Sequence, residues 1–99
     1  IDFDMPNDLV EAQVRYQDDM MGRLLAVELL EKRKTNAAVE LLKERLNEDA
    51  FYGVRIAAAR ALGKQETDEA IEILGASWRN QTDARVRSEV VSAMLAKFQ

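Results

Sequence analysis

Residues 55–62 read Arg-Ile-Ala-Ala-Ala-Arg-Ala-Leu, and the same pattern occurs once before and once after them at a spacing of thirty-two residues. The earlier copy is Arg-Leu-Leu-Ala-Val-Glu-Leu-Leu (23–30), and the later copy is Arg-Ser-Glu-Val-Val-Ser-Ala-Met (87–94). A second pattern alternates with the first, because Asn-Ala-Ala-Val-Glu-Leu-Leu (36–42) returns as Asp-Glu-Ala-Ile-Glu-Ile-Leu (68–74). A repeat of this period is typical of a stacked helical solenoid. The sequence therefore predicts an all-α fold.

Each period divides into two helices, which we name A and B. We expect A helices over residues 20–32, 51–62 and 85–98, where apolar residues recur at offsets of three and four and form one buried stripe. Gly63 follows the middle A helix, and we expect it to end that helix as a left-handed residue. The stripe consists of three sets of equivalent residues: Ala26, Ala58 and Val90; Val27, Ala59 and Val91; Leu30, Leu62 and Met94.

The B helices begin after Thr35 and Thr67, two hydroxyl residues at equivalent positions that suit N-caps. Trp78 is equivalent to Leu46, which predicts a core position for the indole over an exposed aromatic anchor. Projecting the period backward predicts a further B helix over residues 7–17. The inner stripes of the two later B helices are Val39, Leu42 and Leu46 in one and Ile71, Leu74 and Trp78 in the other.

The predicted order is six helices in antiparallel pairs, with an incomplete unit at each end. The half units are residues 1–17 and 82–99, and the two repeats are residues 18–48 and 49–81. Isolated repeats cannot bury their apolar faces, so we expect open stacking surface at both ends and weak self-association through it. We therefore expect the chain to be a piece of a longer protein. The apolar residues expected at the open ends are Val10 and Val14 in front and Val91 and Met94 behind.

Arg23, Arg55 and Arg87 form a ladder along the repeats. Asp19 and Asp83 precede Arg23 and Arg87 by four residues, a spacing at which the two charges can pair on one helix face and contribute about 0.2–0.5 kcal/mol each. Between successive repeats the same charges could also order the turns. We interpret these five residues as a structural ladder in preference to a site for phosphate or an acidic ligand.

Asp83-Ala-Arg-Val-Arg87, followed by an alanine-rich helix, resembles the D-x-x-V-R signature of HEAT-like repeats. Val54-Arg-Ile-Ala-Ala-Ala-Arg-Ala-Leu-Gly63 resembles the short form of that family almost throughout. The resemblance implies a HEAT-like (armadillo-type) α-solenoid over most of the chain. One departure lies before the middle A helix, where six residues instead of four lead from Asp49 to Arg55, and this predicts a longer turn there.

A second resemblance concerns the first part of the chain. Ile-Asp-Phe-Asp (1–4), a helix ending at Tyr16, and then Gln-Asp-Asp-Met-Met-Gly-Arg-Leu-Leu-Ala (17–26) are similar to a junction in M1-family zinc aminopeptidases. There a short β-segment leads into the helical C-terminal region. That family needs H-E-x-x-H and a further Glu for zinc, and this chain has no histidine. The resemblance therefore implies zinc in a parent protein and no cofactor in this fragment.

Composition restricts the function further. The 99 residues form one domain, and the net charge of −4 argues against general nucleic-acid binding, which depends on neutralising phosphates. No apolar run approaches the roughly 20 residues that span a bilayer. Without His or Cys, the common nucleophile–base pairs and most metal sites cannot be assembled. We expect no catalytic residue and no metal ligand; the sequence does not fix a compartment, and the cytoplasm is the one it favours.

Two functions remain on these grounds, both with protein as the partner. The first is a non-catalytic scaffold, the C-terminal region of an M1-like aminopeptidase that supports or encloses its catalytic domain. The second is a free-standing adaptor that binds another protein through its B helices. The charged residues that we expect on that surface are Glu40, Lys43, Glu72 and Arg79.

Overall fold

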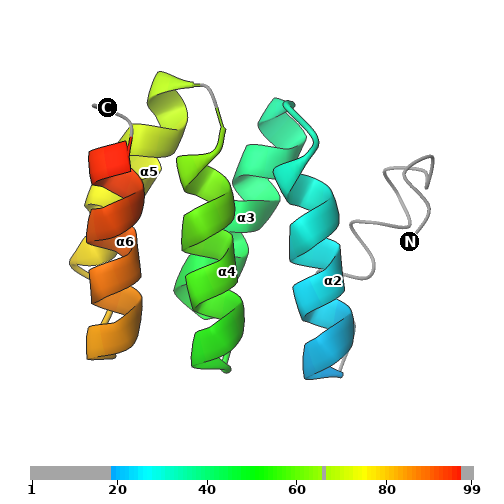
Figure 1. Cartoon of the computed structure of the whole chain (residues 1–99), viewed down its shortest axis with the longest axis horizontal. Helices are drawn as coiled ribbons and strands as arrows, with labels where there is room; N and C mark the ends of the chain where they lie inside the picture. The colour runs from blue at the N-terminus through cyan, green and yellow to red at the C-terminus, as the bar shows by residue number, and fades with distance from the viewer. Residues whose placement is uncertain (1–18, 66, 97–99) are drawn as a thin grey trace.

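The computed structural model describes residues 19–65 and 67–96, and this part of the chain consists of five α-helices without a strand (Figure 1). The prediction of an all-α fold is confirmed. The B helix expected over residues 7–17 lies outside the described residues. The helices are α2 (Met20–Glu31), α3 (Asn36–Glu48), α4 (Tyr52–Gly63), α5 (Asp68–Trp78) and α6 (Ala84–Ala96).

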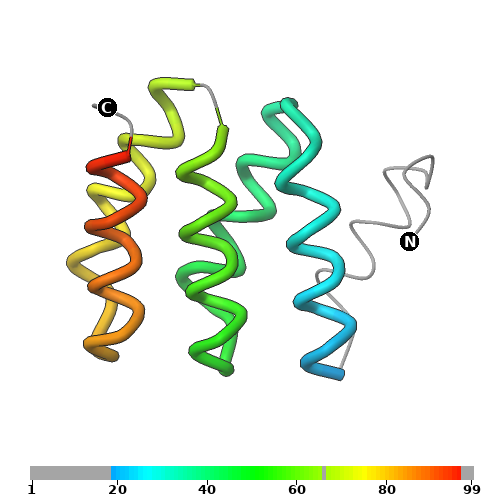
Figure 2. The backbone as a smooth tube through the Cα atoms, viewed as in Figure 1, coloured from blue at the N-terminus to red at the C-terminus, as the bar shows by residue number. Residues whose placement is uncertain are grey.

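The helices form two layers. The A-type helices α2, α4 and α6 stand side by side in one layer, and the B-type helices α3 and α5 stand behind them (Figure 1). The backbone trace runs along one helix and back along the next, so helices that follow each other are antiparallel (Figure 2). Among the described helices, α2 contacts α3 and α4 but neither α5 nor α6. Contacts limited to neighbouring units are those of a solenoid, as the repeat predicts.

Both B-type helices begin where the hydroxyl pattern predicts. The Thr35 Oγ1 accepts a hydrogen bond of 3.1 Å from the Ala38 backbone N–H, and the Thr67 Oγ1 accepts one of 3.2 Å from the Ala70 N–H. Each bond satisfies one of the N–H groups that lack a partner in the first turn of a helix. The two threonines therefore fix the start of α3 and α5 in the same way.

The core lies between the two layers. Leu30, Leu42, Leu62 and Leu74 are almost completely buried, and they come from four different helices. In α4, three alanines are fully buried because this helix lies between α2 and α6 and contacts the B-type helices as well. Small side chains let its neighbours approach on several sides. These alanines are Ala58, Ala59 and Ala61.

Gly63 has a different role from the one expected. No glycine in the described residues has a positive φ; Gly63 is helical, and the C-cap of α4 is Lys64 in the αR region. A Cβ built on Gly63 would lie 2.9 Å from the Cβ of Ala93 in α6. The prediction of a left-handed helix end is therefore wrong. Glycine is needed here because α4 and α6 approach each other closely.

The expectation of a longer turn before α4 is also wrong. Only residues 49–51 separate α3 from α4, whereas residues 79–83 separate α5 from α6. Asp49 is equivalent to Gln81, since each precedes a ladder arginine by six residues. Phe51 is the N-cap residue of α4 and makes no side-chain capping bond, but its N–H donates to the Asp49 Oδ1 at 3.0 Å. Asp49 therefore occupies the repeat position of Gln81 and not that of Asp83. Its distance of six residues from Arg55 does not indicate a longer turn.

The buried stripe leads to a prediction for Leu62. This side chain is fully buried, and Leu62→Ala is expected to lower the free energy of unfolding by about 2–5 kcal/mol, because it removes packed atoms and leaves a cavity. Chemical denaturation measures the effect, with Glu72→Ala, an exposed change on α5, as the control. Equal midpoints for the two variants would contradict the helix phase.

The close contact of α4 with α6 leads to a second prediction. Gly63→Ala is expected to destabilise the fold, because the added Cβ meets Ala93 at 2.9 Å. The matched control is Gly75→Ala on α5, where the nearest atom to the added Cβ is the Met94 Cε at 3.6 Å. Alanine is the better helix former by about 0.5–1 kcal/mol, so the control should be stabilised. Thermal melts of both variants should shift in opposite directions, and a rise for Gly63→Ala would contradict the contact.

Candidate functional site

The most connected polar group in the described residues is the carboxylate of Asp49, in the turn between α3 and α4. Asp49 is 1% exposed. It accepts bonds from the Arg23 Nε at 2.8 Å and Nη2 at 3.2 Å, from the Arg45 Nη1 at 3.2 Å, and from the Phe51 N–H. A buried charge is tolerated only when it is paired and hydrogen-bonded in this way. Asp49 therefore joins α2, α3 and the start of α4.

Arg55 repeats this connection one unit later. Its Nε donates to the Asp49 backbone oxygen, and its Nη1 donates to the Gln81 Oε1 at 2.9 Å. Arg87 donates from Nη1 to the Gln81 backbone oxygen at 3.3 Å. Arg55 thus bonds backward to the turn before its own helix and forward to the turn of the next helix pair, while the forward bond is seen for Arg23 and the backward bond for Arg87.

The forward bonds differ from the expected pairs within one helix. Among the described residues, the ion pair of Arg23 is with Asp49, twenty-six residues later, and not with Asp19. Arg87 likewise bonds to Gln81 rather than pairing with Asp83. The expectation of i,i+4 pairs is therefore corrected. The reason is that the guanidinium groups lie beside the turns between helices: the side chains of Arg23 and Arg55 reach Asp49 and Gln81 in the next helix pair, and that of Arg87 reaches the backbone of the turn before its own helix.

Asp19 and Asp83 act at helix starts. The Asp19 Oδ1 accepts from the Met21 N–H at 3.1 Å, and the Asp83 Oδ1 accepts from the Arg85 N–H at 2.8 Å. The Arg85 guanidinium also hydrogen-bonds to the Asp83 side chain, and this lowers the pKa of that carboxyl to about 2. The Arg85 guanidinium in turn lies 3.5 Å from the ring centroid of Tyr52.

Two buried glutamines were missed in the sequence. The Gln65 Nε2 donates to the Leu30 backbone oxygen at 3.4 Å, and the Gln81 Nε2 donates to the Leu46 oxygen at 3.1 Å. Each amide lies after one helix and caps the C-terminal end of the same kind of helix in the previous unit. The sequence contains a signal for Gln81, because a polar residue stands six positions before each of the three ladder arginines. These residues are Gln17, Asp49 and Gln81.

The buried polar residues therefore lie at the joints between units, by which we mean the contacts between successive helix pairs. The full chain has no His or Cys to activate a nucleophile. In the described ranges, no three acidic side chains come close enough together to hold a metal ion. Nor does any helix there combine the length and apolar character that crossing a bilayer requires. The contacts of the buried polar groups among the described residues are hydrogen bonds and ion pairs.

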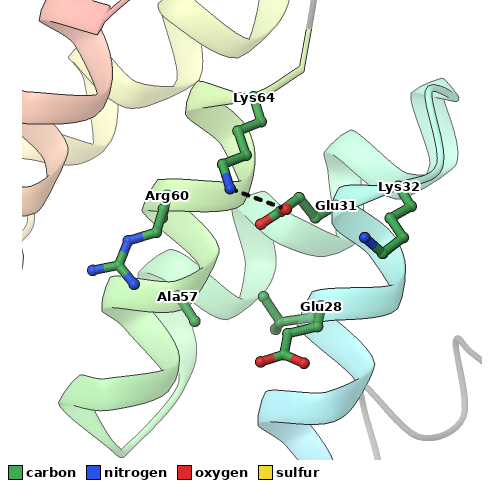
Figure 3. Close-up of a pocket in the computed structure, with 7 residues that line it drawn as sticks. Glu28, Glu31, Lys32, Ala57, Arg60 and Lys64 are labelled. Carbon is green, nitrogen blue, oxygen red and sulfur yellow. Dashed lines mark hydrogen bonds and ion pairs between the residues drawn. The ribbon is translucent and has the colours of Figure 1, made fainter. Parts of the chain in front are cut away.

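Shallow grooves lie on the surface of the described residues. The first, of about 310 Å³, lies between α2 and α4 and is lined by Val27, by Ala57 and by the charged side chains labelled in Figure 3. The Lys64 Nζ pairs across it with the Glu31 Oε2 at 3.2 Å, and Arg60 pairs with Glu89 on α6 at 3.0 Å. The charged rim of this groove is therefore partly neutralised by pairs that join neighbouring A-type helices.

The second groove, of about 380 Å³, lies along α3, next to Asn80 in the turn after α5, on the side of the B-type helices that we call the B face. Glu40 and Lys43 line it, whereas Glu72 and Arg79 do not. All four residues of the expected partner surface are exposed, so the structure leaves their charged groups accessible. It does not gather them into one site.

The third groove, of about 390 Å³, opens on the end of the array formed by α5 and α6. Trp78 lies here and is 37% exposed, although its equivalent Leu46 is completely buried. The core position predicted for Trp78 is therefore wrong. The helix that carries Leu46, α3, contacts α5 of the following unit, whereas no described helix follows α6 beside Trp78. The groove is lined by Gly75, Trp78, Arg79, Val91, Met94 and Leu95.

The buried carboxylate leads to a prediction. Asp49→Ala is expected to destabilise the fold by about 3–5 kcal/mol, because Arg23 and Arg45 would keep their charges in a largely buried place without this acceptor. The control is Glu48→Ala, which removes the same charge from the neighbouring, exposed position. Denaturant titrations compare the two variants. Similar losses for both would show that the charge cluster does not hold the units together.

Comparison with known proteins agrees with this architecture. The sequence pattern described as HEAT repeats matches residues 8–95, which is most of the chain and includes all of α2 to α5. No curated protein and no solved structure gives a significant match. With its period, its two-layered helices and this match over most of its length, the chain belongs to the HEAT-repeat family.

Proposed function

We propose that this chain is a non-catalytic helical-repeat scaffold that holds or presents protein surfaces. The observation that carries the proposal is the use of its buried polar groups. Asp49, Gln65 and Gln81 all bond between units, so the polar interior serves to fix one helix pair against the next. HEAT repeats in general mediate protein interactions, and this assignment agrees with that role.

A more specific proposal concerns the parent protein. The resemblance of residues 1–4 and 17–26 to a junction in M1-family zinc aminopeptidases supports a place in the C-terminal helical region of such an enzyme. In that position the array would support the catalytic domain or form a wall of its substrate cavity. Zinc would belong to another part of the parent, because this chain has no histidine and its described residues offer no ligand cluster.

The alternative is a free-standing adaptor that binds another protein through its B face. The observation that favours it is the exposure of Glu40, Lys43, Glu72 and Arg79 on α3, on α5 and just after α5. Charges of both signs on an accessible face can select a partner by complementarity. The coding sequence upstream of Ile1 separates the two proposals: an H-E-x-x-H motif supports the peptidase parent, and its absence favours the adaptor.

The scaffold proposal predicts hydrolytic inertness. Assayed with chromogenic aminoacyl and peptide substrates, with zinc added, the chain is expected to give only background rates, because it has no imidazole or thiol to act as base or nucleophile. Buffer with zinc alone is the control. Turnover that survives repurification, and that is lost when one carboxylate is mutated, would contradict a non-catalytic role.

A further inference from the structure

The turn between α2 and α3 places three cations directly before a hydroxyl group. It consists of residues 32–35, Lys-Arg-Lys-Thr, and lies at the end of α2 (Figure 1). Lys32, Lys34 and Thr35 are exposed, and Arg33 is partly exposed. The cations suit the negative end of the α2 dipole, and the hydroxyl caps α3. Together these two structural features also form an accessible threonine with a basic segment before it.

Thr67 is the internal comparison for Thr35. Both threonines are exposed N-caps with an extended backbone, and their capping bonds are 3.1 Å and 3.2 Å long. Their neighbours in the chain differ, since Thr67 stands between Glu66 and the pair Asp68-Glu69, whereas α3 has no acidic residue in its first turn. The capping geometry is therefore the same, and the charge around the hydroxyl is opposite.

A phosphate suits the charge around Thr35 and not the charge around Thr67. Phosphorylation adds about −1.5 to −2 charges at neutral pH. On Thr35 this charge would lie at the positive end of the α3 dipole and next to three cations in the chain, whereas on Thr67 it would lie next to three carboxylates. Protein kinases also select substrates by charge pattern, and a basic segment before the hydroxyl complements an acidic substrate groove.

Two other exposed hydroxyl residues, Thr82 and Ser88, follow an arginine by three positions. Thr82 has Asp83 directly after it, which opposes a phosphate by charge. Ser88 lies inside α6, so an extended conformation at Ser88 requires several helical residues to unfold. Thr35 is extended already, and only the first turn of α3 must open, which costs little because helix ends open at low free energy. Thr35 is therefore the better acceptor of the three.

We propose that Thr35 is a phosphorylation site for a protein kinase that recognises basic residues before the acceptor hydroxyl. In the transfer, the Thr35 Oγ1 attacks the γ-phosphorus of ATP, and an O–P bond forms while the bond from that phosphorus to ADP breaks. The hydroxyl proton passes to a carboxylate of the kinase, and ADP leaves. The modification lowers the charge of the turn from three positive charges to about one. This inference goes beyond the scaffold function and does not depend on it.

The test is phosphorylation of the full chain by a kinase of this class. The probe is the catalytic subunit of cyclic-AMP-dependent protein kinase with ATP, and mass spectrometry locates the phosphate. We expect phosphate on Thr35 and none on Thr67. Thr35→Val is expected to abolish this modification, whereas Thr67→Val should leave it unchanged. Each variant loses one equivalent N-cap, so a general loss of folding would affect both of them.

A second pair of variants tests the basic segment. Changing Lys32→Gln together with Arg33→Gln keeps the hydroxyl, and it is expected to lower kcat/KM for phosphorylation of Thr35 by about tenfold or more. The control is Lys43→Gln together with Arg79→Gln, which removes the same charge from exposed positions outside the turn. Circular dichroism of both variants checks that the helices are retained.

Three results would overturn the proposal. The first is a chain that takes up no phosphate, or takes it up on Thr67, Thr82 or Ser88 in place of Thr35. The second is an unchanged kcat/KM after the two glutamine substitutions at Lys32 and Arg33. The third is a synthetic peptide of residues 29–41 that is phosphorylated while the folded chain is not, because the fold would then hide the hydroxyl. None of these results would affect the inertness assay, so they separate this inference from the scaffold function.

Discussion

The arrangement of the units depends on one requirement, the pairing of buried charge at the turns. The Asp49 carboxylate is removed from water and is surrounded by two guanidinium groups and a backbone N–H. Such a cluster is stable only in one geometry, since moving any partner leaves a charge unpaired in a place of low polarity. A solenoid has no long-range contacts to correct an error in stacking. The arginine ladder therefore gives each joint a register that apolar packing alone would not specify.

The features that the sequence predicts correctly depend on interactions within one helix or on the thirty-two-residue period of the apolar residues. The threonine caps require only an oxygen at the right position before a helix, and the buried positions of Leu30, Leu42, Leu62 and Leu74 follow from helical spacing repeated over thirty-two residues. Neither feature depends on which unit is next in space. For this reason the helices, their order and most of the core can be inferred from the spacing of residues alone.

What the sequence did not predict depends on neighbours in space. Asp49 looked like a displaced copy of Asp19 and Asp83, because residue type was matched instead of distance from the ladder arginine. Gly63 looked like a helix end, but its small size matters for the approach of Ala93 from another helix. Trp78 occupies a position that is buried only when a further unit covers it. In each case the periodic pattern predicts where the residue stands in the repeat, but it does not predict which residues of other helices surround it.

The same distinction bears on function. In this chain the buried polar side chains stabilise the fold. Arginine and aspartate connect the turns of successive units, and glutamine amides cap the ends of helices in the previous unit. The exposed grooves of the described residues include two with charged linings, one between α2 and α4 and one along α3, and a more apolar one on α5 and α6 with Arg79 beside it. Arg87, Val91 and Met94 of α6 stand at the same repeat positions as Arg23, Val27 and Leu30 of α2, and Val27 is buried whereas Val91 is exposed. Equivalent positions of the repeat are therefore used in two ways in the described residues, for burial against a neighbouring helix pair or as exposed apolar surface.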